Sequence, residues 1–554
     1  MMSLTQSFHL FGDDPSTAKS VQLGEKQDLV ALKKLLVNAF RIAGKQELGF
    51  QDSKQALETF EDVISSSGPV GITLDGGRVK KIDGPAGLPI VGNYYEYFPD
   101  TIGNRGRLFK KYGSIFKLTN MGQPIHFTND PAIAMVAMAE GQYFTKKINS
   151  VHPLFTTKDN TALFIGDTET ENWSLSHKFI PPSMSPKAVR HYTPKMQACV
   201  RQSFKVFDQL DEENISFNAT PYMLKLASAF IGDVVLGMDF GQLESKDSPL
   251  HPLIEQIFSW LAAFQRVSTK GGWYASLPFG DPKLMRDNRA KLWAMLGEQV
   301  DVARQDIGPD LPLHDAALEA KSILDYLLRA VDKEGKKYPV ELLYSNIVIV
   351  AAAGFLTTAT LLSWLLYSMS VYPGVQDRLI QELVDHGINE NTVWTPELSN
   401  SLPYLTNFIK ETQRLHNPAH QPARTSKKEV ILPGGYRLPA EQCLVSSLYD
   451  LHTNPKVWEN PQRFDPDRWD TEAVKNRPQG SYLPFATGPR GCIGFNLTLG
   501  EVKVLLPELV YRYEFLKDGD EPVQYDPEFL VIKPLNFYVR AKKRTHWPEP
   551  TAKA

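Results

Sequence analysis

A glycine-rich loop near the C-terminus places a single cysteine directly before a predicted helix. Residues 484–494 read PFATGPRGCIG, and a largely apolar run over 495–511 follows. The loop amides and the helix N-terminus direct partial positive charge at the sulfur of Cys492, which favours the thiolate over the thiol. A thiolate in such a loop, with the ring of Phe485 and the cation of Arg490 close in sequence, is a candidate axial ligand for haem iron. The alternative is a small buried cysteine after a glycine turn.

The spacing within this loop is more specific than any one of its residues. Phe485, Gly488, Arg490, Cys492 and Gly494 form the pattern F-x-x-G-x-R-x-C-x-G, which resembles the haem-binding signature of the cytochrome P450 superfamily of haem-thiolate monooxygenases. The resemblance extends over roughly residues 84–545 and is strongest from residue 347 onward. It implies haem b, iron protoporphyrin IX, as the cofactor, with Cys492 as the metal ligand and with Phe485 and Gly494 beside the cofactor.

Five side chains are candidates for binding the haem propionates. Trp173 and His177 lie four residues apart on a predicted helix, so they share a face, and both can donate a hydrogen bond to an anion. By the same resemblance Arg424, His452 and Arg490 are propionate ligands, since a guanidinium matches a carboxylate. Most members of the family have arginine at the position of His177. Histidine there resembles the soluble fatty-acid hydroxylase branch. For His452 a buried structural role is an equal alternative.

Residues 347–366 are twenty consecutive residues without a charge, long enough to span a membrane. Gly354 and several hydroxyl side chains interrupt the run, and no strong basic flank accompanies it. We therefore predict a long helix buried in the centre of a helical protein.

The middle of this helix resembles the oxygen-binding segment of the family. The resemblance implies that Gly354 leaves room above the iron and that Thr357 shares the hydrogen bonding of dioxygen, whereas Leu356 stands where the family has an acid. A carboxylate organises proton delivery in a way that leucine cannot. Three interpretations stay open: oxygenation with Thr357 and water alone, chemistry that does not split dioxygen by that route, or another acid that reaches in from elsewhere.

Glu411 and Arg414 match the Glu-x-x-Arg motif of the family. Residues three apart on a helix are neighbours, and an arginine fork meets a carboxylate in a bidentate way. Alone, the motif is commonly a surface pair of little energetic value. The resemblance implies a buried triad that Arg463, in the run PQRF over 461–464, completes.

Composition restricts the class of protein. The chain has 554 residues, 42% hydrophobic and 22% charged, which is typical of a globular protein with a large core. A formal charge of -3 gives no global case for nucleic acid binding. Cys199, Cys443 and Cys492 are too few for a disulfide framework or a structural zinc site, which indicates a reducing compartment.

The segment before residue 83 differs in character from the rest. It contains neither an apolar signal-peptide region nor a transmembrane anchor, so we expect a protein that is cytoplasmic or peripherally associated with the endoplasmic reticulum. We predict an N-terminal helical and hairpin extension over 1–82 and a haem-thiolate catalytic domain over 83–554. Within the extension, 29–42 and 53–64 are expected to be helices and 70–82 a hairpin. The basic helix 29–42 could bind a membrane, but packing on the main domain is favoured.

The predicted fold is mainly α with a small β lobe, the cytochrome P450 fold, with haem between the central helix and the Cys492 loop. We expect a monomeric monooxygenase that inserts oxygen from dioxygen into a small hydrophobic substrate, with no nucleic acid partner. The chain lacks a flavin domain, so electrons from NADPH would come from a separate flavoprotein reductase. By family analogy the substrate is a specialised metabolite of fungal type, with fatty acids next. The alternatives are a redox-independent haem isomerase or dehydratase, and a non-catalytic haem sensor.

Overall fold

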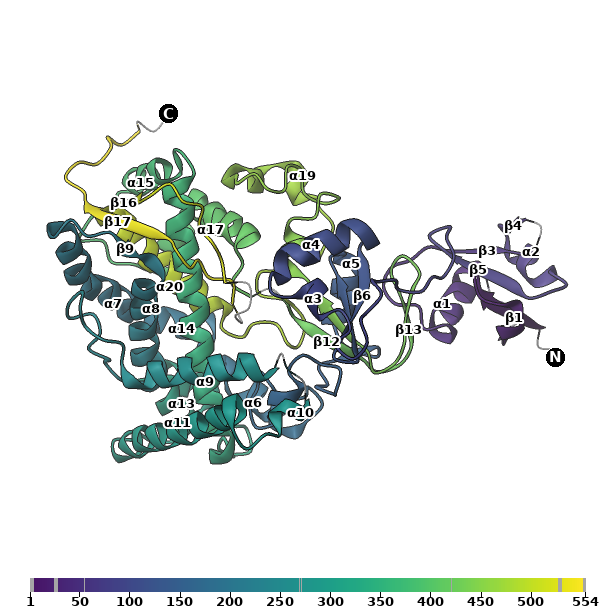
Figure 1. The fold of residues 1–554 in the computed structure, drawn as a ribbon, viewed down its shortest axis with the longest axis horizontal. Helices are drawn as coiled ribbons and strands as arrows, with labels where there is room; N and C mark the ends of the chain where they lie inside the picture. The colour runs from purple at the N-terminus through teal and green to yellow at the C-terminus, as the bar shows by residue number, and fades with distance from the viewer. Residues whose placement is uncertain are drawn as a thin grey trace.

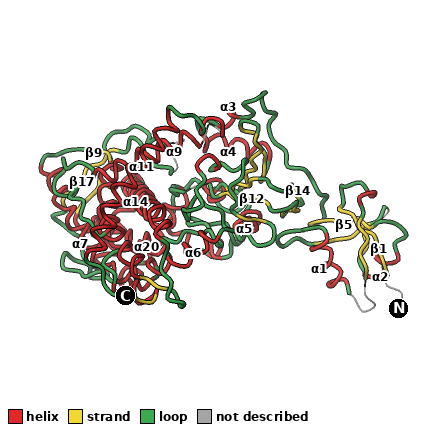
Figure 2. The backbone as a smooth tube through the Cα atoms, turned by 90° about the horizontal axis from the view of Figure 1, so that it is seen from below, coloured by secondary structure: helices red, strands yellow, loops and turns green. Residues whose placement is uncertain are grey.

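The computed structural model describes residues 4–23, 28–53, 55–268, 270, 272–419, 421–526 and 531–551. A large helical body carries smaller sheets, and a separate lobe built from the N-terminal residues projects from one end (Figures 1 and 2). The predicted mainly helical architecture with a smaller strand-rich part is confirmed. The principal helices of the body are α4 (Thr101–Tyr112), α5 (Pro131–Met138), α6 (Glu171–Phe179), α7 (Pro186–Glu212), α8 (Ala219–Ile231), α9 (Pro252–Ser268), α11 (Gly280–Gln305), α13 (Ile323–Arg329), α14 (Val340–Val371), α15 (Val375–Asp385), α17 (Pro403–Leu415) and α20 (Phe495–Arg512).

Helix α14 is the central element of the body. It runs for 32 residues, and its apolar side chains on every face are buried against neighbours, chiefly α8. Among the described residues two helical stretches, Ala219–Leu236 and α14, are long and apolar enough to cross a bilayer. However, 78% of the most apolar part of α14 is buried inside the protein. The prediction of a buried central helix is therefore confirmed, because a helix that is hydrophobic all round belongs in a core.

A mixed sheet lies beside the helical body and frames one side of the site. Its strands are β6 (Ile115–Asn120), β7 (Gln123–Thr128), β8 (Phe144–Thr145), β12 (Ala423–Ser426) and β15 (Cys443–Ser446), in the order β6-β7-β15-β12-β8. β6 and β7 form a hairpin, and β15 joins β7 in parallel. A second small sheet pairs β16 (Tyr513–Lys517) with β17 (Tyr538–Lys543) and β9 (Phe217–Asn218) next to α20.

The N-terminal lobe is a five-stranded sheet with its own core, and not the predicted helical and hairpin extension. Its strands β1 (Leu4–Leu10), β2 (Lys19–Leu23), β3 (Leu48–Gln51), β4 (Ala56–Leu57) and β5 (Val70–Leu74) lie in the order β2-β1-β5-β3-β4. The central strands β1 and β5 are parallel, and each has an antiparallel neighbour. With α1 (Leu29–Ala39) between the two hairpins in the chain, this order is the β-grasp topology.

Three local predictions for this lobe were wrong. Residues 70–74 do not pair within a hairpin over 70–82 but form the central strand, which residues distant in sequence complete. The expected helix over 53–64 is confined to α2 (Phe60–Ser65). The apolar face of α1, with Leu32 and Leu36 fully buried, packs in the core of the lobe itself and not on the main domain.

The lobe contacts the body through the hairpin of β13 (Val430–Leu432) and β14 (Tyr436–Leu438) (Figure 1). The amide of Ala43 donates to the carbonyl of Ile431 at 2.8 Å, and the Ile431 amide donates to the carbonyl of Arg41 at 3.0 Å. The Ile431 side chain is 1% exposed and belongs to the core of the lobe. Arg437 forms an ion pair with Asp13 across the same contact. The β13–β14 hairpin is thus shared between the lobe and the body.

Candidate functional site

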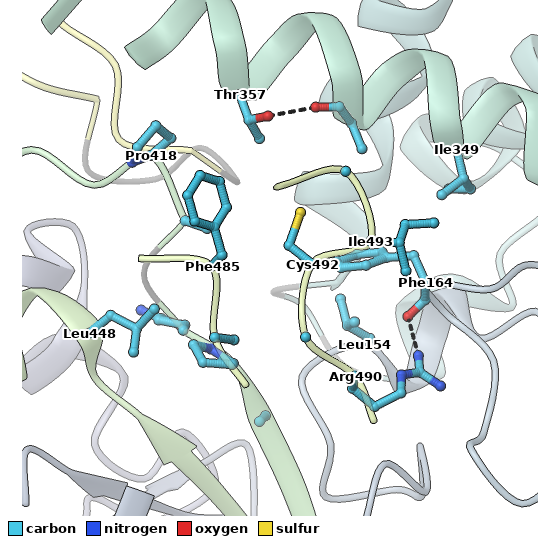
Figure 3. A pocket seen from close by; sticks show the side chains of 18 of the residues that line it. Leu154, Phe164, Ile349, Thr357, Pro418, Leu448, Phe485, Arg490, Cys492 and Ile493 are labelled. Atoms are coloured by element: carbon cyan, nitrogen blue, oxygen red, sulfur yellow. Dashed lines mark hydrogen bonds between the residues drawn. The ribbon is translucent and has the colours of Figure 1, made fainter. Parts of the chain in front are cut away.

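A cavity of about 540 Å³ separates α14 from the loop 484–494. Figure 3 shows the sulfur of Cys492 projecting from the loop into this space, with Thr357 of α14 on the opposite side and Phe485 beside the gap. Most of the remaining wall is apolar, with contributions from α8, α14 and the sheet. The predicted pair of opposing elements, a cysteine loop and a central helix, is therefore present with open space between them.

Close backbone contacts fix the cysteine loop. The amide of Cys492 donates to the carbonyl of Phe485 at 2.9 Å, which folds the loop back on itself. Gly488 has φ +74°, and a Cβ there would lie 2.0 Å from the carbonyl oxygen of Met138 on α5. No other residue type fits this position, because a side chain would be strained and would clash with backbone.

The environment of the Cys492 sulfur differs from the expectation in one respect. Burial raises the pKa of the Cys492 thiol, and the backbone amide of Gly494 only partly lowers it. The side chain is nevertheless exposed to the cavity. Protein therefore surrounds the sulfur while one side stays open, and burial opposes the thiolate that the loop amides favour. A bound metal cation would supply the missing positive charge.

Four of the five predicted propionate ligands converge on one end of the cavity. Trp173 and His177 stack on each other with ring centroids 4.6 Å apart on α6, and the guanidinium of Arg490 lies 5.4 Å from the Trp173 ring. Arg490 also donates to the carbonyl of Leu163 at 2.8 Å, which holds it in place. Arg424 reaches the same wall from β12.

Sequence reasoning missed two residues of this group, Lys146 and His152, which line the same wall. Lys146 is 7% exposed, and burial together with the charges of Arg490 and Arg424 lowers its pKa well below the usual value. Burial and Arg424 likewise lower the pKa of Arg490 to about 10. Glu140 is an acid in this group, and its Oε1 lies 2.8 Å from Arg424 Nε. A lysine next to another lysine is typical of a surface segment, so no local pattern indicated this burial.

This wall is suited to an anionic group. Buried donor atoms of Trp173 (Nε1), Arg424 (Nη2) and His152 (Nε2) have no hydrogen-bond partner among the described residues. Unpartnered donor atoms beside buried cations that repel each other are stabilised by an anion that accepts their hydrogen bonds. The carboxylates of haem propionates have that chemistry. The Cys492 sulfur lines the same cavity and could bind the haem iron. The residues present therefore fit haem.

The structure does not bring His452 into this cavity, and its assignment as a propionate ligand was wrong. His452 is fully buried in the core, where its Nε2 accepts a hydrogen bond from the amide of Leu483 at 2.9 Å. Burial lowers its pKa to about 3. The neutral imidazole therefore orients the chain that leads into the cysteine loop, which is the structural alternative that the sequence left open.

The buried triad exists, but its third member is Arg468 and not Arg463. Arg414 binds Glu411 through two bonds of 2.8 and 2.9 Å, and Arg468 Nε lies 2.9 Å from Glu411 Oε1. The Arg463 side chain is 71% exposed, and only its carbonyl takes part, as an acceptor from Arg414 and Arg468. The run Pro466-Asp467-Arg468-Trp469 repeats the spacing of 461–464, so the sequence contained the correct arginine as a second match.

The residues of α14 divide between the cavity and the core. The hydroxyl of Thr357 borders the cavity and donates to the carbonyl of Ala353 at 2.7 Å. Gly354 also borders it and packs closely against α8, because a Cβ there would lie 2.7 Å from Ile231 Cδ1, the end of a side chain that can shift. Leu356 is 6% exposed and belongs to the hydrophobic core. The position at which the family has an acid is therefore occupied here by a core residue.

Comparisons with known proteins agree with this geometry. The family model described as cytochrome P450 matches residues 82–541. The chain is 47% identical to the cytochrome P450 monooxygenase alnD of Emericella nidulans, over 98% of this chain and 99% of that protein. It is 26% identical to the bifunctional cytochrome P450/NADPH–P450 reductase ascE of Acremonium egyptiacum, over 84% of this chain and 43% of that protein. The solved haem domain of cytochrome P450DA superposes with a TM-score of 0.75 at 20% identity, over 84% of this chain and 98% of that structure.

Proposed function

We propose that this chain, which belongs to the cytochrome P450 family and is a cytochrome P450 monooxygenase, oxidises a small apolar intermediate of specialised metabolism. In this proposal the protein is a monomer and receives electrons from a separate NADPH-dependent flavoprotein reductase. The observation that carries this proposal is the Cys492 sulfur facing Thr357 across a cavity of about 540 Å³ with mostly apolar walls. The similarity to a fungal monooxygenase favours oxygenation over the isomerase and the sensor.

The residues of the site have distinct roles in this proposal. Bound haem b supplies the reduction of dioxygen and the transfer of one oxygen atom to the substrate. Cys492 would hold the iron, and its sulfur would donate electron density to it. Arg424 and Arg490, with Trp173 and His177, would orient the cofactor through its carboxylates. Rotation of the Thr357 hydroxyl away from the Ala353 carbonyl frees it to donate a hydrogen bond into the cavity.

Apolar walls determine which molecules bind in the cavity. Among the residues that line it on the side of α8 and α14 are Ile231, Val235, Ile349 and Val350. These side chains favour a hydrophobic substrate and exclude water, which limits unproductive reduction of dioxygen. Gln265 and Asn120 add polar groups to the wall and support a substrate with a few oxygen atoms.

We also propose that residues 1–82 and 83–554 are two folding units. The separate core of the N-terminal lobe and the start of the family match at residue 82 support this division. For the location of the protein, Leu88 and Ile90 follow the lobe with exposed fractions of 58% and 88%. Such exposed apolar side chains support peripheral association with a membrane such as the endoplasmic reticulum.

The proposed reaction is tested by expressing the wild type and Cys492→Ala in the same host under labelled dioxygen, with metabolite mass spectrometry as the readout. We expect a product that contains the heavy oxygen and appears only with the wild type. A new product with the mass of its precursor, or lighter by water and without label, would favour the isomerase or dehydratase instead. Labelled product from both variants would remove Cys492 from the reaction.

A further inference from the structure

Two polar side chains from distant parts of the sequence meet at the wall of the cavity. Tyr97 is the last residue of α3 (Tyr94–Tyr97), and Gln421 lies in the segment that joins α17 to β12. Both line the cavity, and the Nε2 of Gln421 donates to the Tyr97 hydroxyl at 2.8 Å. Helix α3 lies beside the mixed sheet and away from α14 in both views of the fold (Figures 1 and 2). Tyr97 is therefore on the sheet side of the cavity.

The Tyr97 hydroxyl has a proton that no protein acceptor uses in the part of the chain that the structure describes. Its oxygen accepts two hydrogen bonds, one from Gln421 and one from Nη1 of Arg105 at 3.4 Å. A phenolic hydroxyl can accept such bonds and still donate one of its own. The Tyr97 hydroxyl can therefore donate a hydrogen bond to an oxygen atom of a molecule that occupies the cavity.

The cation behind Tyr97 does not make this part of the cavity positive. Arg105 is fully buried, and its Nε lies 3.1 Å from Oδ2 of Asp450, whose side chain is 6% exposed. This ion pair has no net charge. The described lining residues that α3, β6 and β7 contribute are also uncharged: Tyr97, Asn120, Ile125 and Phe127. An ionised group bound here would lose its hydration without gaining a counter-charge, so the site favours a neutral group.

We propose that Tyr97, held by Gln421, binds the carbonyl oxygen of a neutral substrate, a ketone, ester or lactone. This inference names the substrate class and rests on the proposed function. A carbonyl oxygen accepts the unused Tyr97 proton, whereas a hydrocarbon leaves that proton unpaired after it displaces water. A site built around a hydrogen bond discriminates against analogues that lack the acceptor. The apolar wall formed by α8 and α14 would then contact the hydrocarbon part of the substrate.

Titration of the haem-loaded protein tests the site without turnover, with the shift of the haem Soret band as the readout of binding. The probes are methyl octyl ketone, the matching alkene in which a CH₂ group replaces the carbonyl oxygen, and decanoate. The alkene keeps the shape of the ketone but accepts no comparable hydrogen bond. We expect the wild type to bind the ketone more tightly than decanoate, because the carboxylate would lose hydration without a counter-charge. Tighter binding of decanoate would overturn the neutral class.

Tyr97→Phe removes the donor and keeps the ring, which packs on Phe127 with centroids 5.4 Å apart, so the fold and the haem content should persist. We expect the Kd of the ketone to rise about three- to tenfold and that of the alkene to stay within about twofold, as for the loss of one neutral hydrogen bond. Tyr95→Phe is the matched control and should match the wild type, since Tyr95 is on the same helix, 73% exposed and not at the cavity wall. An equal change in Kd for ketone and alkene, or an unchanged ketone Kd, would refute the site.

Gln421→Met keeps the experiment decisive if Tyr97→Phe does not load haem. Methionine has a similar length but no amide, so the Tyr97 hydroxyl would lose the bond of 2.8 Å that orients it. We expect the Kd of the ketone to rise in this variant as well, while the Kd of the alkene stays at the wild-type value. A ketone Kd equal to that of the wild type would contradict the role of Gln421 in holding Tyr97.

The carbonyl site and the proposed function fail in different ways. If ketone binding depends on Tyr97 as expected, but no host metabolite gains labelled oxygen, the proposed function fails and the carbonyl site stands. If a metabolite gains labelled oxygen, but Tyr97→Phe changes the Kd of ketone and alkene equally, the carbonyl site fails and the function stands. A wild type that binds the alkene but not the ketone would also refute the carbonyl site.

Discussion

Replacing Arg468 should damage the protein far more than replacing Arg463, although the two arginines are five residues apart in similar sequence contexts. Arg468 is 8% exposed, and its Nε lies 2.9 Å from the Oε1 of a glutamate, Glu411, that is itself fully buried. Its other nitrogens donate to three carbonyls of the loop 459–463. Arg468→Ala therefore leaves a buried carboxylate with one cation fewer and removes three hydrogen bonds to the loop 459–463.

The expected magnitude follows from these contacts. Breaking a buried charge network by removing one partner costs about 3 to 5 kcal/mol. Arg463→Ala removes a side chain that is 71% exposed and pairs with Asp465 at only 3.6 Å, so its cost should stay within about 0.5 kcal/mol. Both variants keep the Arg463 carbonyl that the network uses.

The assay is urea-induced unfolding of the haem-loaded protein, followed by haem absorbance and by far-UV circular dichroism. Arg463→Ala should unfold at the wild-type midpoint with full haem content. Arg468→Ala should unfold at a much lower urea concentration, or accumulate without haem. Equal midpoints for the two variants, or greater damage from Arg463→Ala, would refute the assignment of Arg468 to the triad.

Three further predictions follow from the fold and the site. Gly488→Ala should lose most bound haem, measured as the ratio of haem to protein absorbance, because a Cβ would lie 2.0 Å from the Met138 carbonyl oxygen. Burial lowers the pKa of His452 to about 3. Between about pH 6.5 and pH 3 the unfolded state therefore binds a proton on this imidazole that the folded state does not bind. The free energy of unfolding consequently falls as the pH falls from 6.5 towards 3. His452→Gln should remove about 1.4 kcal/mol per pH unit of that acid destabilisation in urea titrations between pH 6 and about pH 4; an unchanged slope would mean that the buried imidazole titrates normally. Ile431→Asp should detach the N-terminal lobe from the β13–β14 hairpin, because Ile431 is 1% exposed in the lobe's core, and limited proteolysis should then cut near residues 83–92 while the haem spectrum persists; resistance equal to that of the wild type would contradict this contact.

The parts of the site that short-range spacing determines were predictable from the sequence. The cysteine loop is one continuous segment whose glycines and cysteine have fixed relations, and Trp173 and His177 are one helical turn apart, so each motif could be read without knowing the fold. The triad shows the limit of this reasoning. Two runs of the form Pro-x-Arg-aromatic lie side by side, and only packing against α17 decides which arginine is buried.

Long-range pairing explains the other failures. The central strand β5 of the N-terminal lobe pairs in parallel with β1, more than fifty residues earlier, and local hydrophobic patterns contain no record of such a partner. Lys146 has an ordinary surface-type side chain, and its burial brings it close to Arg424 and Arg490, which are distant in sequence. For that reason the charged wall appeared only in three dimensions.

The central claim is that Cys492 binds haem iron as a thiolate in the cavity below α14. The most direct test is the carbon monoxide difference spectrum of the reduced, haem-loaded protein, compared between the wild type, Cys492→Ser and Cys199→Ser. Cys199 lies on α7, does not line the cavity, and controls for loss of a thiol elsewhere. We predict the red-shifted Soret band of a thiolate-ligated haem in the wild type and in Cys199→Ser, and its absence in Cys492→Ser. The same thiolate band in Cys492→Ser would contradict the account.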